Sequence, residues 1–189
     1  MLNTPHSANA VLKMLRVQAN TGSLHKMDSH ARTSYPQNVI WLMLSTLIIL
    51  IDQASKWGVR QLFQPYLPVK VLPFLNIQLA FNSGTAFGLF NNHTSVARWG
   101  LVAAALVIMG YLIICLLQTE PDKKMVLAAL AFIIGGAVSN LLDRFSLGYV
   151  TDFIDFHIQQ WHFATFNIAD AAISVGAVCW VCILLLKRD

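Results

Sequence analysis

The chain has 189 residues, of which 56% are hydrophobic and only 12% are charged, and its mean hydropathy is +0.58. Soluble domains carry about 25% charged residues, so this composition excludes a soluble globular protein and indicates an integral membrane protein. The net charge of +4 comes from basic residues scattered along a hydrophobic chain, which favours contact with anionic membrane lipids and argues against a nucleic-acid partner.

The first segment, residues 1–37, is polar and has no apolar core, so it does not resemble a secretory signal. We expect it to be a disordered leader on the cytoplasmic side, followed by a membrane domain at residues 38–189. Met14 and Met27 are alternative natural starts, in which case part of the leader is not expressed.

Four apolar segments follow the leader, and each approaches the roughly 20 residues that cross about 30 Å of hydrocarbon. In chain order they are 33–51 with a continuation to 57, 99–117, 125–142, and a last segment from near Asn167 to Leu186. The sequence therefore predicts an all-α membrane protein with four transmembrane helices. Cys115, Cys179 and Cys182 each lie inside such an apolar run, and we interpret them as packing residues.

The long loop between the first two spans has a pattern of its own. Its apolar residues Leu75, Ile77, Leu79 and Phe81 alternate with polar or small residues. This period of two predicts a half-buried strand, and the Asn-Ser-Gly sequence at 82–84 predicts a turn after it. We therefore expect a small β-sheet in the outer loop between spans one and two.

The basic residues favour one orientation of the four spans. With both termini inside, the cytoplasmic side holds eight basic residues and the outer side five. The inner set is Lys13, Arg16, Lys26, Arg32, Lys123, Lys124, Lys187 and Arg188, and the outer set is Lys56, Arg60, Lys70, Arg98 and Arg144. We expect both termini to be cytoplasmic.

Polar residues within the spans gather at their outer ends in this topology. The residues concerned, together with two acids of the outer loop between spans three and four, are Asp52, Lys56, Gly136, Asn140, Asp143, Arg144, Asp152, Asp155, Asn167, Asp170 and Ser174. Because an ionised side chain inside the membrane costs roughly 2.5 kcal/mol or more, their convergence indicates a functional pocket at the outer surface.

Most of these residues also have a purely structural interpretation. Asp52 and Lys56 can form a helix ion pair that anchors the end of the span, and Arg144 can extend to the interface or pair with Asp143. The asparagines can join helices by hydrogen bonds, the Gly-Gly pair at 135–136 can permit close helix packing, and Asp155 is interpreted as a solvated loop charge.

Asp170 resists a structural interpretation most, because no basic residue lies within a helical turn of it. Two neighbouring aspartates can share one proton, so that one activates a water while the other protonates the departing amine. Asp152 and Asp155 are both candidate partners. They would share one side of a helix but turn to opposite sides of an extended segment, and their spacing does not decide between them.

Five motifs occur in one order along the chain: DQASK at 52–56, NSGTAFG at 82–88, GGAVSNLLDR at 135–144, VTDFIDF at 150–156 and FNIAD at 166–170. Together they resemble the lipoprotein signal peptidases of bacteria, the signal peptidase II family, over residues 38–187. The resemblance implies an aspartyl endopeptidase of the inner membrane that cuts prolipoproteins before a diacylglyceryl-modified cysteine. It implies no cofactor and no metal, and we expect a monomer.

By motif position, the resemblance implies that Asp152 and Asp170 are the catalytic pair. It implies that a further set lines or braces the substrate pocket: Asp52, Lys56, Asn82, Gly136, Asn140, Arg144 and Asn167. Asp143 is expected to hold Arg144 or nearby backbone. One departure is Ser139, where the family has glycine, and we expect its hydroxyl to bond back to a helix carbonyl.

Two other classes of function are compatible with polar residues in a membrane protein. A proton-coupled transporter would spread its acids through the membrane thickness and often contain inverted repeats. A non-enzymatic assembly factor would use the polar residues only for helix packing, so that Asp170→Asn would leave its function intact. The gathering of the acids on one side argues against the transporter.

Overall fold

Four helices of the described residues are long and apolar enough to cross a membrane: Pro36–Leu62, Trp99–Gln118, Lys124–Ser146 and Ile168–Leu186. The structure is a computed structural model that describes residues 34–84 and 95–186. The four predicted spans are confirmed. The predicted leader lies almost wholly outside the described residues.

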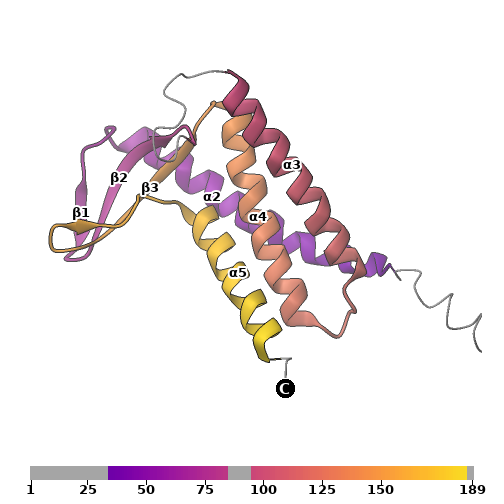
Figure 1. Cartoon of the computed structure of the whole chain (residues 1–189). Helices are drawn as coiled ribbons and strands as arrows, with labels where there is room; N and C mark the ends of the chain where they lie inside the picture. Colours follow the sequence, from indigo (N-terminus) through magenta and orange to yellow (C-terminus); the bar gives the residue numbers. More distant parts are fainter. Residues whose placement is uncertain (1–33, 85–94, 187–189) are drawn as a thin grey trace, which may run out of the picture. The chain divides into compact units, whose positions relative to one another are not determined.

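The helical elements are η2 (Pro36–Trp41), a 3₁₀ turn that opens on a proline and leads directly into α2 (Leu42–Leu62), then α3 (Ser95–Gln118), α4 (Lys124–Ser146) and α5 (Ile168–Leu186). Helix α4 packs against α2, α3 and α5 (Figure 1). It buries 50% of its most apolar stretch, whereas the other three spans bury 17–22%. The polar residues Ser139, Asn140 and Asp143 of α4 are among its buried residues.

The apolar core lies between α3 and α4, where five buried side chains pack together: Leu112, Leu116, Leu127, Leu130 and Ile134. Most other large apolar side chains of the spans stay accessible, as expected of helices that face lipid. This core holds the helices together at a distance from the polar residues.

A four-stranded antiparallel sheet has the strand order β1 (Val69–Leu72), β2 (Leu75–Asn82), β3 (Val150–Ile158) and β4 (Trp161–His162). The predicted strand in the first long loop is confirmed as β2. The sheet also takes β3 and β4 from the loop between α4 and α5, so two loops far apart in sequence form one sheet at one end of the helices (Figure 1). We call this end the sheet end.

Strand β2 contains a bulge where it pairs with β3. Ile77 pairs with Ile154 and Ala80 pairs with Asp152, so three steps along β2 match two along β3. The extra residue reverses the face to which the following side chains turn. The strict alternation predicted for this strand is therefore wrong, and its buried residues are Asn76 and Leu79, three apart.

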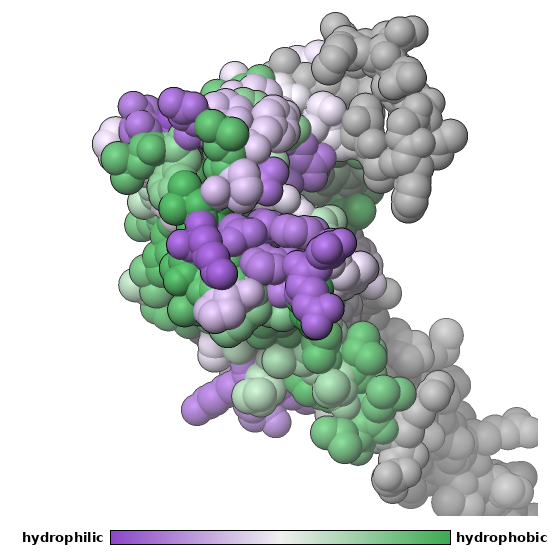
Figure 2. Space-filling model, turned by 90° about the vertical axis from the view of Figure 1, so that its left-hand side faces the viewer, coloured by the Kyte–Doolittle hydropathy of each residue, from purple (hydrophilic) through white to green (hydrophobic). Residues whose placement is uncertain are grey.

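The surface seen from the side of the sheet is divided by polarity. Figure 2 shows hydrophilic residues in a band across this face, with hydrophobic residues beside and below it. This division is typical of a protein that has one end in water or headgroups and the remainder in hydrocarbon.

Candidate active site

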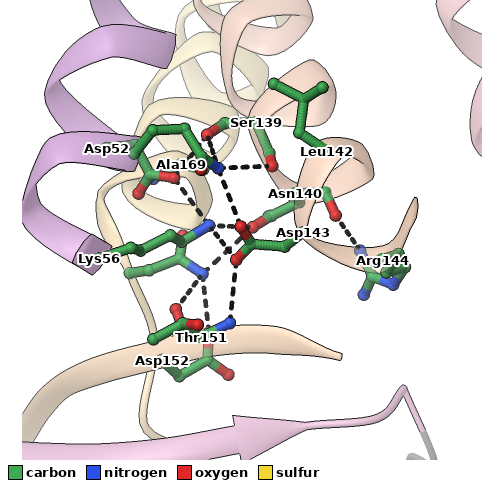
Figure 3. Close-up of polar contacts among 12 residues, drawn as sticks. Asp52, Lys56, Ser139, Asn140, Leu142, Asp143, Arg144, Thr151, Asp152 and Ala169 are labelled. Carbon is green, nitrogen blue, oxygen red and sulfur yellow. Dashed lines mark hydrogen bonds and ion pairs between the residues drawn. The ribbon is translucent and has the colours of Figure 1, made fainter. Parts of the chain in front are cut away.

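The polar residues predicted from the spans and the second loop converge at the sheet end, between α2, α4, β3 and the start of α5 (Figure 3). Four of these polar residues have side chains that are no more than 1% exposed: Asp52, Lys56, Asp143 and Asn167. Since buried charges persist only when paired and hydrogen-bonded, the contacts of each carboxylate define what the site can do.

Asp170 is fixed by the way in which α5 begins. The Asn167 side-chain oxygen accepts a 2.9 Å hydrogen bond from the Asp170 backbone N–H, and the Asp170 carboxylate accepts one of 3.2 Å from the Asn167 backbone N–H. This reciprocal pair is a capping box, with Asn167 as the N-cap. The positive end of the helix dipole also stabilises a carboxylate there, so the helix start itself supports the Asp170 charge.

Asp152 comes from β3 and lies among amide donors. Its carboxylate accepts hydrogen bonds of 3.0 Å from Asn82 Nδ2 and 2.7 Å from Asn167 Nδ2. Burial and, to a smaller extent, the nearby charge of Asp170 raise the pKa of Asp152, whereas the hydrogen bonds from Asn82 and Asn167 lower it; the net result is a rise from 3.8 to about 6. Asp152 therefore holds a proton at a pH where an ordinary aspartate has lost it.

Two asparagines connect the carboxylates to each other. The Asn140 amide donates to Asp170 Oδ1 at 2.8 Å, while its oxygen accepts from Asn167 Nδ2 at 3.2 Å. Asn167 thus contacts Asp152 through its side chain and Asp170 through its backbone. The two acids belong to one hydrogen-bonded group in which every surrounding amide is already oriented.

Lys56 lies behind this group and is 0% exposed. Its ammonium contacts Asp52 at 2.7 Å, Asp143 at 3.1 Å and the Asn140 oxygen at 2.9 Å (Figure 3). Asp52 and Lys56 do form the predicted helix ion pair, and that pair is also the support of Asn140. Positive charge on Lys56 favours the amide orientation in which the Asn140 NH₂ group points at Asp170.

Asp52 and Asp143 join this network to the backbone of neighbouring elements. Asp52 accepts a 2.9 Å hydrogen bond from the N–H of Ala169, in the first turn of α5. Asp143 accepts one of 3.0 Å from the N–H of Thr151 on β3, which agrees with its expected role of holding nearby backbone. The two elements that present the catalytic candidates are therefore each attached to a buried aspartate.

Sequence reasoning did not identify Gln53 and Thr151 as members of the site. Gln53 Nε2 donates to Asp143 at 2.9 Å and to the Ser139 hydroxyl at 3.0 Å. The hydroxyl of Ser139 donates to Asp52 at 2.7 Å, so the expected bond back to a helix carbonyl is wrong. The nearby acid is the stronger acceptor because it is charged.

Asp155 is not a solvated loop charge, and that interpretation is wrong. It is 1% exposed and contacts Asn76 and His162. Because β3 is extended, Asp155 turns to the face opposite Asp152, and its partners lie away from Asp170. Asp152 is therefore the acid that the strand directs to Asp170.

Gly136 and Arg144 occupy different places in the site. A Cβ at Gly136 would collide with the carbonyl oxygen of Ala169 and lie 2.8 Å from Ile173, so Gly136 permits the close approach of α4 and α5. Arg144 lies to one side of the buried network, with a 3.4 Å hydrogen bond from its guanidinium to the Asn140 carbonyl oxygen (Figure 3).

A pocket of about 370 Å³ opens beside Asp170. Its lining is apolar apart from one carboxylate and one hydroxyl, and consists of Phe163, Phe166, Asp170, Ala171, Ser174 and Val175. An apolar cavity that ends at a carboxylate is suited to a ligand with a hydrophobic part and a polar reacting group.

The arrangement links two carboxylates through Asn167. Asp152 keeps its proton up to a pH of about 6, and Asp170 accepts hydrogen bonds from the Asn140 amide and from the Asn167 backbone N–H. Such a pair can activate a water and protonate a leaving amine. Within the described residues, no group of three or more His, Cys, Asp or Glu side chains has the geometry to hold a metal ion.

Comparison with known proteins gives a consistent result. The family model described as signal peptidase (SPase) II matches residues 44–186. A lipoprotein signal peptidase of Coxiella burnetii (strain Dugway 5J108-111) is 44% identical over 146 residues, which are 77% of this chain and 90% of that protein. One from Yersinia enterocolitica serotype O:8 / biotype 1B is 41% identical over 137 residues, 72% of this chain and 81% of the relative.

A solved bacterial membrane enzyme has the same fold, with a TM-score of 0.72 and 26% sequence identity, covering 85% of this chain and 100% of the other. The region matched by the family model includes most of the first span and the other three spans, both sheet-forming loops and every acid of the buried network. By family model, by sequence and by fold, this chain belongs to the signal peptidase II family.

Proposed function

We propose that this protein is an aspartyl endopeptidase that removes signal peptides from prolipoproteins, cutting before a cysteine that bears a diacylglyceryl group. Family membership supports peptidase activity on lipoprotein precursors. The observation that carries the aspartyl assignment is that the carboxylates of Asp152 and Asp170 are joined through Asn140 and Asn167, and that the pKa of Asp152 is raised to about 6.

In the proposed reaction, Asp170 is the general base and Asp152 the general acid. Asp170 removes a proton from a water, which attacks the scissile carbonyl carbon, and Asp152 gives its proton to the departing amine nitrogen. Asn140 and Asn167 keep both carboxylates oriented, and Lys56 keeps Asn140 oriented. We infer that Asn82, which donates to Asp152, and Arg144, which donates to the Asn140 carbonyl, contact the substrate backbone.

We also infer how the protein lies in the membrane. We expect it in the bacterial inner membrane with both termini cytoplasmic and the sheet end outside, because that orientation puts the larger number of basic residues inside. The acid pair then lies at the outer surface, where a lipid-anchored cysteine also lies. We expect a monomer to be active, since one chain supplies both carboxylates, their amide donors and the pocket.

The test is incubation of the purified protein with a prolipoprotein that carries the diacylglyceryl group and, separately, with the same precursor lacking it. We expect the mature lipoprotein from the lipid-modified precursor and little product from the other, because a site at the membrane surface with an apolar pocket binds the lipid chains as well as the peptide. Equal turnover of both precursors would contradict the proposed substrate.

The same assay tests metal independence. We expect EDTA to leave turnover unchanged, because the acid pair and its amide donors complete an acid–base mechanism from the side chains alone. Loss of activity with EDTA and its recovery with added zinc would overturn the aspartyl mechanism. Asp170→Asn is the matched control for background cleavage.

A further inference from the structure

A hydrogen-bonded pair, Asp155 and His162, lies outside the network that supports the catalytic candidates; its carboxylate is buried and its imidazole is about half exposed. The Asp155 carboxylate lies 2.8 and 3.0 Å from His162 Nδ1, and it accepts a 2.8 Å hydrogen bond from Asn76 Nδ2. Burial by itself raises the pKa of Asp155, but hydrogen bonds from Asn76 and His162 outweigh burial and hold this pKa below its usual range. The acid chemistry of Asp152 and Asp170 does not use this charge.

The hydrogen bond between Asp155 and His162 ties β4 to the sheet. The β3–β4 hairpin has only two residue pairs, His157 with His162 and Ile158 with Trp161, and so short a hairpin is marginal without further contacts. The rings of His157 and His162 stack at 5.0 Å. The Asp155 contact adds a charged hydrogen bond from the middle of β3 to the end of β4.

The chain leads from this tie to the active-site pocket within a few residues. After His162, the N–H of Phe163 bonds to the Phe156 carbonyl at 2.8 Å, and the N–H of Phe166 bonds to the Ile154 carbonyl at 3.0 Å. The rings of Phe163 and Phe166 meet edge to face at 6.0 Å, and both line the pocket beside Asp170. A displacement of His162 would therefore move one wall of the pocket.

We propose that Asp155 and His162 are positioning residues whose hydrogen bond holds Phe163 and Phe166 in place as the aromatic wall of the pocket. The pair thereby sets the affinity for the apolar part of the substrate and takes no part in bond cleavage. This inference rests on the proposed function, because that function supplies the substrate. Other titratable groups near Asp155 are His157 on β3 and Lys70 on β1, the latter in register with Asn76.

The test is the steady-state kinetics of full-length variants on a diacylglyceryl-modified prolipoprotein. His162→Phe keeps an aromatic ring but removes the donor, and we expect its KM to rise about three- to tenfold with kcat unchanged, the pattern of lost binding. His162→Asn places an amide donor near the position of Nδ1 and should restore most of the KM. The alkaline limb of the pH profile should not move in either variant.

His157→Phe is the matched control from the same hairpin. The ring nitrogens of His157 are buried without a hydrogen-bond partner among the described residues, so replacing this histidine by phenylalanine should leave KM at the wild-type value. Asp155→Asn is a second variant that keeps the size of the side chain, and its KM should rise like that of His162→Phe. If the pair acts through the wall, adding His162→Phe to Phe163→Ala should raise KM no further.

An unchanged KM in folded His162→Phe and Asp155→Asn would overturn the inference. A loss of kcat together with a shifted limb of the pH profile would also overturn it, because that result would assign Asp155 and His162 to the catalytic acids. The activity of the wild-type protein shows whether a negative result concerns the positioning role or the proposed function. Failure of the wild-type protein to cleave the lipid-modified precursor contradicts the proposed function itself, whereas cleavage with equal kinetics in wild type and variants contradicts only the positioning role.

Discussion

At the residue scale, Asp170 shows how a carboxylate is kept at the edge of a hydrophobic helix. The start of α5 supplies its N-cap partner, a backbone donor and the helix dipole. The sequence Asn-Ile-Ala-Asp before an apolar run contains this information, because an N-cap residue followed three positions later by an acid is a capping-box pattern. The sequence therefore predicts where Asp170 lies, and its capping-box pattern also contains the reason why the carboxylate is stable there.

The sequence could not show whether Asp152 or Asp155 is the partner of Asp170. Two residues three positions apart share a side of a helix but lie on opposite faces of a strand. Gly148, with a positive φ, marks a turn just before β3, but the strand has no regular alternation of polarity, and five of its first six residues are buried. Its conformation depends on pairing with β2 and on the bond between Thr151 and Asp143. Those contacts exist only in the folded chain.

The first prediction concerns the acid pair. Asp152→Asn and Asp170→Asn should each abolish cleavage while the protein still accumulates in the membrane, because asparagine keeps the size of the side chain but carries no titratable proton. The double variant should be little worse than either single one, since the pair acts as a unit. Turnover of purified variants, with melting temperature recorded alongside, is the measurement.

Asp155→Asn is the comparison for that experiment, and it should retain kcat at saturating substrate. If instead Asp155→Asn were inactive and Asp152→Asn active, the assignment of the second acid would be wrong. If Asp170→Asn still cleaved, the aspartyl mechanism would be wrong.

The second prediction follows from the pKa of Asp152, which is raised to about 6. Because the protonated form is the acid, kcat/KM should fall as the pH rises above about 6. The sign for stability is the same: the folded protein binds this proton more tightly than the unfolded chain, so the contribution to stability is present below pH 3.8 and is lost as the pH rises through about 6.

Asn82→Ala provides the check on that assignment. The hydrogen bond from Asn82 lowers the pKa of Asp152, so its removal should move the alkaline limb of the kcat/KM profile to higher pH, whatever the loss in rate. A limb that stays in place would mean that it reports another group.

At the scale of elements, the central position of α4 depends on glycine at two contacts. A Cβ at Gly135 would lie 2.9 Å from the Ser45 carbonyl oxygen of α2, and one at Gly136 would collide with the Ala169 carbonyl of α5. The pair was interpreted from sequence as permitting close packing, and this is confirmed. The sequence could not show which helix approaches which glycine.

The third prediction is that Gly136→Ala destabilises the protein by about 1–3 kcal/mol, the usual effect of overpacking a tight contact. The reason is that α4 and α5 must separate to admit the methyl group, which also strains the bond between Asn140 and Asp170. Thermal unfolding in detergent measures the first effect and turnover the second.

Gly110→Ala is the matched control on α3, where an added Cβ meets nothing within 4 Å. It should leave the melting temperature unchanged or raise it, because alanine favours helix. Equal destabilisation by both substitutions would show that the contact with α5 is not the cause.

At the scale of the whole molecule, two loops that lie about 70 residues apart in sequence form one sheet, and so they lie on the same side of the membrane. An even number of crossings separates them, in agreement with the four spans. Hydropathy predicted the spans because lipid imposes a length and a composition on each helix. The joined sheet depends on long-range strand pairing, which a single sequence does not reveal.

The fourth prediction concerns orientation. A fluorescent protein that folds only in the cytoplasm, fused after Asp189, should be fluorescent, whereas alkaline phosphatase inserted in the turn at Gln159 should be active, since it folds outside. The basis is the excess of basic residues on the side of the termini. The opposite result for both fusions would reverse the topology and put the acid pair on the cytoplasmic side.

The bulge in β2 makes the length of this strand a functional property. Asn76 and Asn82 are six residues apart and would share a face in a regular strand, yet they serve two acids on opposite faces of β3, Asp155 and Asp152. Deletion of one residue between Ile77 and Ala80 would leave the sequence of both asparagines intact and still turn Asn82 away from Asp152. Homologous strands should therefore tolerate substitutions in this segment far better than any change in its number of residues.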